Sequence, residues 1–194
     1  MLDLDPATHT LAGLVGRVRD GQLTGPTPCP GTSVAGLLDH IDGFAQAFAA
    51  AAKHATPPGG SRPPTVDASR LDPEWRMGIP ARLATLADAW RAEDAWTGMT
   101  KAGGLDLPSE VAGIIALDEV VVHGWDLAVA TGQPYEVDGQ LLEAVYGFVR
   151  ASAEQNPEGT PGLFGPPVAV ADDASLLHRV IGLAGRDPAW QADT

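Results

Sequence analysis

The chain has 194 residues, and 44% of them are hydrophobic, a composition typical of one globular domain and too apolar for a disordered chain. Acidic residues outnumber basic residues by 25 to 12, which gives a formal net charge of −13 and disfavours nucleic acids and anionic membranes as partners. The single Cys29 excludes an intramolecular disulfide and a multi-cysteine metal cluster. We therefore expect one domain over residues 1–194 in the cytoplasm, without an export signal or a membrane span.

The spacing of apolar residues predicts a helical protein. Ser33 is a good N-cap for a strongly amphipathic second helix, and Gly132 follows the fourth helix as a stop. Within that fourth helix, Val120 to Val122 could also form a strand, but the length of the segment favours a helix. In chain order we expect helices over 4–18, 33–53, 81–98, 111–131, 138–154 and 172–184.

Two segments are not predicted to be regular. Residues 54–80 are rich in proline and glycine and form a long connection, which in a compact domain indicates a crossover, a lid or a functional loop. Residues 156–194 form a C-terminal extension with one short helix. The expected fold class is all-α, a four-helix bundle with a long crossover and C-terminal helical appendages.

The common signatures of nucleotide-binding, phosphate-binding and serine-hydrolase sites are absent, as is Cys-x-x-Cys. What remains is Glu119-Val-Val-Val-His123, in which Glu119 and His123 are four residues apart and share one helix face. Such a pair is half of a metal site. A solvent-exposed Glu–His pair is the alternative, although the apolar surroundings make an unpaired glutamate costly.

The position of each residue along its helix suggests a third ligand. His40 lies about 10 Å from the start of the second helix, and His123 lies about 12 Å from the end of the fourth. If the two helices are antiparallel, these distances place His40 and His123 at nearly the same level along the bundle axis. A crossover over 54–80 makes them antiparallel, in an up-down-down-up bundle. His40, Glu119 and His123 would then form an open metal site, with zinc as the default ion and iron, nickel or manganese as alternatives.

The remaining candidates fit this site less well. Asp126 lies three residues after His123, where it could orient the imidazole or, equally, bond Trp125 or a nearby backbone group. Cys29 belongs to the loop before the second helix, and we interpret it as a packed structural thiol rather than a ligand. The other three histidines are expected away from the site: His9, His54 and His178.

Several segments carry a family resemblance. They are Thr27-Pro28-Cys29-Pro30 with Leu37-Leu38-Asp39-His40, Val122-His123-Gly124-Trp125-Asp126-Leu127-Ala128 with Thr131-Gly132-Gln133-Pro134, and Phe164-Gly165-Pro166 with Gly185-Arg186-Asp187-Pro188. The chain resembles actinobacterial DinB-like (YfiT-like) metal-binding proteins related to the N-terminal domain of mycothiol-dependent maleylpyruvate isomerase. The resemblance implies a DinB-like bundle and a divalent metal held by His40, Glu119 and His123.

One departure is that relatives commonly place a tryptophan shortly after the Cys-Pro, where this chain has Gly31-Thr32-Ser33. We expect no sterol-carrier-like second domain, so the resemblance does not carry over isomerisation of maleylpyruvate. We expect a metal-dependent thiol transferase or isomerase that combines mycothiol with a small electrophile. A metal-dependent hydrolase and a non-catalytic metal-binding or ligand-sensing protein are the alternatives. The oligomeric state is left open, with a homodimer as one option.

Overall fold

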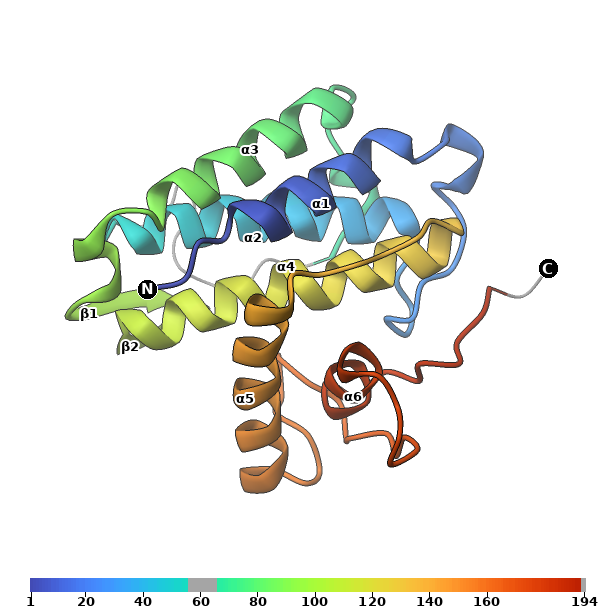
Figure 1. The fold of residues 1–194 in the computed structure, drawn as a ribbon. Coiled ribbons are helices and arrows are strands. Elements are labelled where there is room, and N and C mark those ends of the chain that lie inside the picture. The colour runs from blue at the N-terminus through green and yellow to red at the C-terminus, as the bar shows by residue number, and fades with distance from the viewer. Residues whose placement is uncertain (56–65, 193–194) are drawn as a thin grey trace.

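The computed structural model describes residues 1–55 and 66–192. Four long helices form the bundle (Figure 1): α1 (Asp5–Arg17), α2 (Val34–Ala52), α3 (Trp75–Ala89) and α4 (Ser109–Thr131). Helices α1 and α4 run in one direction and α2 and α3 in the other, which is the up-down-down-up order predicted from the sequence. In the described residues, no helix is long and apolar enough to cross a membrane.

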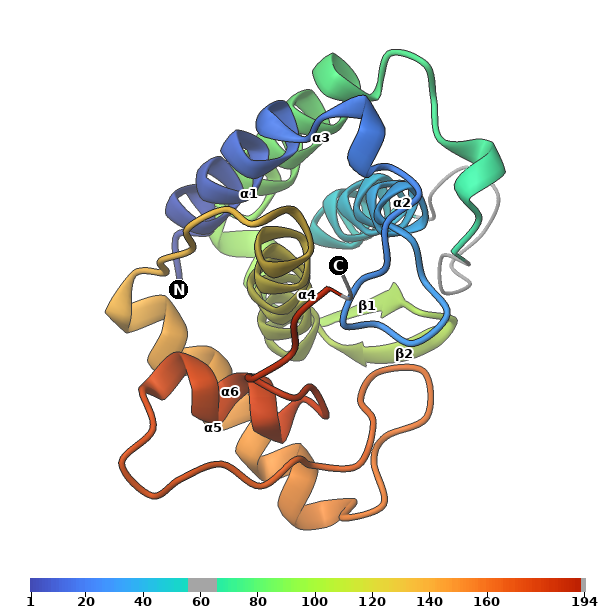
Figure 2. The same ribbon diagram turned by 90° about the vertical axis from the view of Figure 1, so that its right-hand side faces the viewer.

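The four helices enclose the core in a ring (Figure 2), in which α1 packs on α3, α3 on α2, α2 on α4 and α4 on α1. Helix α2 begins where the sequence predicted, because the Ser33 side chain accepts a hydrogen bond from the Gly36 N–H at 3.2 Å. The helix buries the side chains of four residues in the core: Leu37, Leu38, Ile41 and Phe44. The adjacent turn of α2 carries His40, so core packing fixes its position.

Helix α4 is buried on almost all sides, because the bundle covers one face and the C-terminal part of the chain covers the other. It ends at Gly132, which adopts the left-handed conformation at φ 68°. The β-branched residues Val120 to Val122 are helical and buried, so the strand alternative is wrong. Helices α5 (Gly139–Gln155) and α6 (Leu176–Leu183) lie on the side of α4 away from α3 (Figure 2).

The segment between α2 and α4 departs from the prediction in two places. Helix α3 begins at Trp75, ahead of Pro80, whereas we expected it to follow that proline. Burial of Trp75 and Ile79 favours this first turn, and Arg76 anchors it by donating to the carbonyl of Val18 at 3.0 Å. Residues 56–65 of the predicted 54–80 connection lie outside the described residues. A short 3-10 helix, η2 (Ala68–Arg70), precedes α3.

Helix α3 ends at Ala89, earlier than the predicted end near Gly98. A short 3-10 helix, η3 (Glu93–Trp96), and a hairpin of β1 (Met99–Ala102) and β2 (Leu105–Pro108) follow. The hairpin is absent from the sequence prediction. It is antiparallel and turns through Gly103 and Gly104, both with positive φ. This Gly-Gly pair is a hairpin signal, but the strands are too short to show an alternating pattern. The fold remains mainly helical, as predicted.

Two smaller deviations occur, one toward each end of the chain. Helix α6 begins at Leu176, after its N-cap Ser175, and not at the predicted Asp172 or Asp173. Another 3-10 helix, η1 (Asp20–Gln22), follows α1.

Candidate metal centre

Three side chains from two helices meet inside the bundle. His40 comes from α2, and Glu119 and His123 come from α4. Glu119 Oε2 lies 3.2 Å from His40 Nε2 and 3.1 Å from His123 Nε2. One donor atom from each residue lies within 4.8 Å of the other two. The structure thus brings together the three residues that the sequence pointed to, because α2 and α4 are antiparallel and Glu119 and His123 are one helical turn apart.

The group is covered by an aromatic ring on one side and keeps a small part of its surface exposed. Phe44 packs against both imidazoles, with its ring centroid 5.7 Å from that of His40 and 6.1 Å from that of His123. The side chains of His40, Glu119 and His123 keep 15%, 15% and 12% of their surface exposed. The group is therefore shielded from bulk water but accessible.

His123 is also held at its second ring nitrogen. The carboxylate of Asp126 is fully buried, and its Oδ2 lies 2.9 Å from His123 Nδ1. A hydrogen bond from Nδ1–H to a carboxylate fixes the tautomer in which Nε2 carries a free lone pair. Of the two roles considered for Asp126 from the sequence, the geometry matches the orientation of the imidazole.

Arg186 approaches the same carboxylate from the C-terminal part of the chain. Its guanidinium lies 3.3 Å from Asp126 Oδ2. Figure 2 shows the segment after α6 running back across α4 toward the loop that precedes α2. Sequence reasoning gave Arg186 no role, and its one signal was the segment Gly185-Arg186-Asp187-Pro188.

Cys29 also lies closer to the site than the sequence suggested. Its thiol donates to Asp126 Oδ2 at 3.1 Å and lies 4.0 Å from His123 Nδ1. The antiparallel arrangement explains this, because the loop before α2 then meets the C-terminal half of α4. The thiol is half-buried and contacts polar groups of the site.

Cys29, His123 and Asp126 form a second group with suitable donor atoms. The guanidinium of Arg186 lies 3.5 Å from the thiol and 3.3 Å from the carboxylate of this group. A positive charge therefore already neutralises it, which disfavours a metal cation there. The group of His40, Glu119 and His123 has no such cation beside it among the described residues.

The ionisation of these groups follows from their contacts. Burial would raise the pKa of Glu119, but hydrogen bonds from His123 and His40 outweigh it and lower the pKa below its ordinary value. Burial would lower the pKa of His123, yet its contacts with Asp126, Cys29 and Glu119 raise the pKa well above the ordinary value. Burial would likewise raise the pKa of Asp126, and the charge of Arg186 outweighs it. Two carboxylates are thus ionised around one imidazole.

This arrangement fits a divalent cation. Two imidazole nitrogens and one carboxylate oxygen are the donor set of open zinc sites, which leave a further position for water or substrate. In the absence of a metal, a proton on His123 supplies positive charge between Glu119 and Asp126, in addition to the charge of Arg186 beside Asp126. A metal ion bound between His40, Glu119 and His123 would take over that role.

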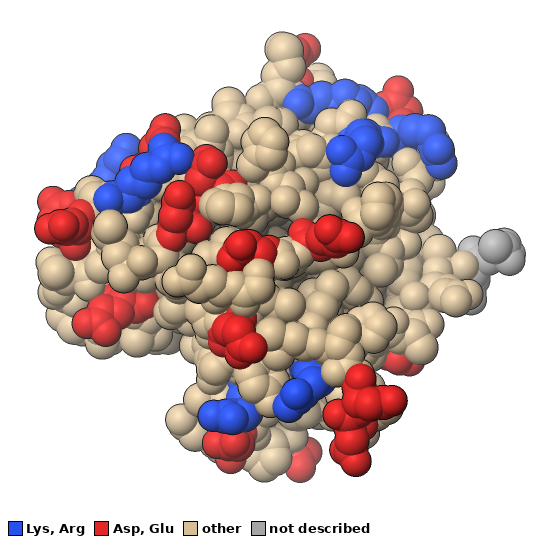
Figure 3. Space-filling model, in the orientation of Figure 1, with Lys and Arg blue, Asp and Glu red and all other residues tan. Residues whose placement is uncertain are grey.

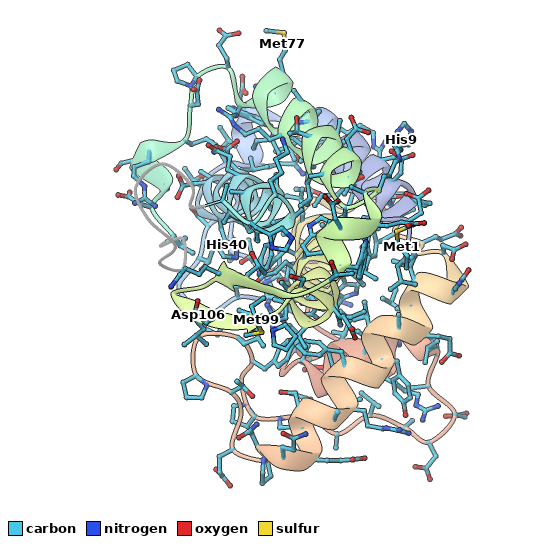
Figure 4. The ribbon with its side chains drawn as sticks, turned by 90° about the vertical axis from the view of Figure 1, so that its left-hand side faces the viewer. Met1, His9, His40, Met77, Met99 and Asp106 are labelled. Atoms are coloured by element: carbon cyan, nitrogen blue, oxygen red, sulfur yellow. The ribbon has the colours of Figure 1, made fainter. Side chains whose placement is uncertain are left out.

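The other histidines lie elsewhere. Both ring nitrogens of His54 lie near backbone carbonyls, at 3.2 Å from Met99 and 3.1 Å from Asp94. His9 and His178 are exposed. Figure 4 shows His40 beside α2 in the interior and His9 on the outside of the bundle.

The family model described as the Mycothiol maleylpyruvate isomerase N-terminal domain matches residues 4–128, which is more than half of the chain. The chain belongs to this family. The uncharacterized proteins MT0763 and Rv0738 of Mycobacterium tuberculosis, from strains CDC 1551 and H37Rv, are each 31% identical to it over 157 residues. This alignment spans 78% of the chain and 77% of each relative.

Solved structures show the same fold. A crystal structure of the mycothiol-dependent maleylpyruvate isomerase superposes with a TM-score of 0.67 at 19% identity, and covers 97% of this chain and 88% of that one. A histidine-to-alanine mutant of that isomerase superposes with a TM-score of 0.59 at 19% identity, over 79% of this chain and 69% of that one. The residues of the family match include His40, Glu119, His123 and Asp126, whereas Arg186 lies beyond them.

One further acidic group belongs to the same helix. Asp118 is 2% exposed, and its Oδ1 has no hydrogen-bond partner in the described part of the chain. Burial and the neighbouring charge of Glu119 raise the pKa of Asp118 to about 8. Without a bound metal, the uncharged form of this aspartic acid is therefore favoured at neutral pH.

Proposed function

We propose that this protein binds a divalent metal ion, Zn²⁺ in the first instance, through His40, Glu119 and His123. We further propose that it uses the metal in a mycothiol-dependent transfer or isomerisation of a small electrophile. The observation that carries the proposal is the convergence of two imidazole nitrogens on one glutamate oxygen, at 3.2 and 3.1 Å. Membership of the mycothiol maleylpyruvate isomerase family supports mycothiol as the thiol.

A divalent metal bound at this position would favour the thiolate form of a small thiol at neutral pH. The residues of the chain support this chemistry in distinct ways. Asp126 holds His123 with Nε2 directed at Glu119. Arg186 keeps Asp126 ionised, so that the carboxylate remains an acceptor for Nδ1–H. Phe44 covers one side of the imidazoles and limits access of water.

The proposal names a class of reaction and not one substrate. Maleylpyruvate is the substrate named for the structurally similar isomerase, and the 19% identity to that protein supports the fold. The small exposed fraction of the three donors favours a small electrophile. The single cysteine in the chain is the reason to place this function in the reducing cytoplasm.

The metal is tested first. Protein purified without chelator should contain close to one metal ion per chain by elemental analysis, and the His40→Ala and His123→Ala variants should contain about tenfold less. His178→Ala is the matched control, because this histidine is exposed and lies on α6, outside the four-helix ring. Full metal content in both site variants would overturn the assignment of the ligands.

The reaction is tested with mycothiol and monochlorobimane, a generic electrophile that becomes fluorescent on reaction with a thiol. The rate of conjugation should fall to the uncatalysed rate after metal removal and recover when Zn²⁺ is restored. A rate that is unchanged by metal removal would contradict metal-dependent catalysis. Metal binding without any acceleration would support the non-catalytic alternative.

A further inference from the structure

A cavity lies away from the metal centre, between α5, α6 and the loop over residues 167–170. Its volume is about 410 Å³, and it is widely open to solvent. Tyr146 and Arg150 of α5 and Arg179 and Leu183 of α6 contribute to its lining. Figure 3 shows basic atoms on this face over α5 and α6, each of which contains one basic residue other than histidine.

Two guanidinium groups share one aromatic ring in this cavity. The Cζ atoms of Arg179 and Arg150 lie 4.9 Å and 5.6 Å from the centroid of the Tyr146 ring. Arg179 also donates to the Tyr146 hydroxyl at 2.6 Å. The two positive charges are therefore within about 10.5 Å of each other, the largest separation that these two distances allow.

Among the described residues, these two arginines make one ion pair with a carboxylate. Arg150 lies 3.7 Å from Glu154, and both side chains are more than half exposed, so this ion pair is weak. For Arg179 the described part of the chain supplies no carboxylate within 4.0 Å; its polar contact is the neutral Tyr146 hydroxyl. In a chain with a net charge of −13, two neighbouring cations with so little compensation favour an anion.

The remaining walls define the rest of the ligand. Pro167, Val168 and Leu183 present apolar surface to the cavity. An inorganic anion would satisfy the arginines and leave these walls in contact with water. The planar guanidinium fork matches a carboxylate in two parallel hydrogen bonds. An apolar body attached to the carboxylate would cover the walls.

The loop over residues 167–170, which forms one wall of the cavity, is fixed against α6. The Val168 N–H donates to the carbonyl of Gly182 in α6 at 2.8 Å. A Cβ atom at position 182 would lie 2.7 Å from the Val168 carbonyl oxygen, so this close approach requires glycine. The loop and α6 thus form a preformed pocket.

We propose that this cavity is a binding site for a small organic carboxylate with an apolar body. It is separate from the metal centre, because none of its lining residues is a metal donor or a contact of one. The inference does not depend on the proposed function, and either can fail without the other.

Benzoate is the probe. In a titration followed by ¹H–¹⁵N NMR, benzoate should shift the amide signals of Val168, Arg179 and their neighbours in a saturable manner. The double variant Arg150→Gln/Arg179→Gln should bind benzoate at least tenfold more weakly. Arg19→Gln, which removes an exposed arginine at the other end of the chain, should bind as the wild type does.

Two ligand controls separate charge from apolar contact. Benzyl alcohol lacks the charge and inorganic phosphate lacks the apolar body, so each should bind at least tenfold more weakly than benzoate. Phosphate binding as tight as that of benzoate would overturn the proposed ligand class. Absence of saturable shifts up to 20 mM benzoate would overturn the site.

Two protein controls exclude the metal centre and misfolding. The variant His40→Ala/His123→Ala should keep its affinity for benzoate, and loss of binding there would place the carboxylate at the metal centre and contradict the proposal. Gly182→Ala should weaken binding by displacing the loop while both arginines remain. Unfolding curves of each variant establish that it is folded at the temperature of the titration.

Discussion

Asp126 holds the imidazole of His123 from behind, with Oδ2 2.9 Å from Nδ1 in a fully buried position. The Asp126→Asn variant keeps the shape of the side chain and removes its charge. We expect its affinity for Zn²⁺ to fall about 10- to 100-fold, the usual effect of losing the partner of a ligating histidine. Competition with a chromogenic zinc chelator measures this change. An affinity within twofold of the wild type would show that Asp126 does not support the metal ligand.

Zinc binding should depend on pH in a direction set by His123. Its contacts raise its pKa well above the ordinary value, so at neutral pH a proton competes with the metal for the imidazole. The pKa of Glu119 is lowered, so the carboxylate does not add a competing proton. The apparent affinity for Zn²⁺ should therefore rise as the pH increases from 6 to 8, by up to about tenfold per pH unit. A constant affinity over this range would contradict the protonated imidazole.

The same titration on Asp126→Asn provides an internal control. Loss of the acidic partner removes one cause of the raised pKa of His123. The dependence of zinc affinity on pH should then be shallower than in the wild type. An unchanged slope would assign the proton competition to another group.

Arg186→Met tests the ion pair between the C-terminal segment and α4. Asp126 is fully buried, and removal of the guanidinium leaves its negative charge with weaker compensation. We expect the free energy of unfolding, measured with urea, to fall by roughly 3–5 kcal/mol. The double variant Arg186→Met/Asp126→Asn should recover part of the loss, because it removes both charges. A loss as large in the double variant as in Arg186→Met would point to packing instead.

Asp118→Asn tests the buried aspartic acid beside Glu119. The folded protein holds its proton up to about pH 8, whereas the unfolded chain releases it near the ordinary pKa of 3.8. Between these two values the native state binds more protons, so this residue lowers the stability of the wild type as the pH rises. The effect ends above about pH 8, where both states are ionised.

The Asp118→Asn variant should therefore become more stable relative to the wild type as the pH rises, as measured by the free energy of unfolding. From pH 5 to pH 7.5 the growth should be roughly 3 kcal/mol, at about 1.4 kcal/mol per unit of pKa difference. Both proteins are measured without metal in the same urea series. A difference that is independent of pH would show that Asp118 is ionised in the folded protein.

The sequence by itself determined most of the helices and pointed to the three residues of the candidate metal centre. The cap at Ser33, the stop at Gly132 and the apolar spacing between them are local signals, and the i, i+4 relation of Glu119 and His123 follows from helix geometry alone. The length of the 54–80 connection and the heights of His40 and His123 pointed to antiparallel helices, which the structure has.

Tertiary packing decided what local signals could not. Helix α3 begins before Pro80, because burial of Trp75 and Ile79 in the bundle outweighs the hydrogen bond that the proline cannot make. Arg186 and Cys29 both contact Asp126. Arg186 is 60 positions away from it in the sequence, and Cys29 is 97 positions away. No spacing rule spans such separations. Only the return of the C-terminal segment across α4 makes Arg186 the counter-ion of a carboxylate that the bundle has already removed from water.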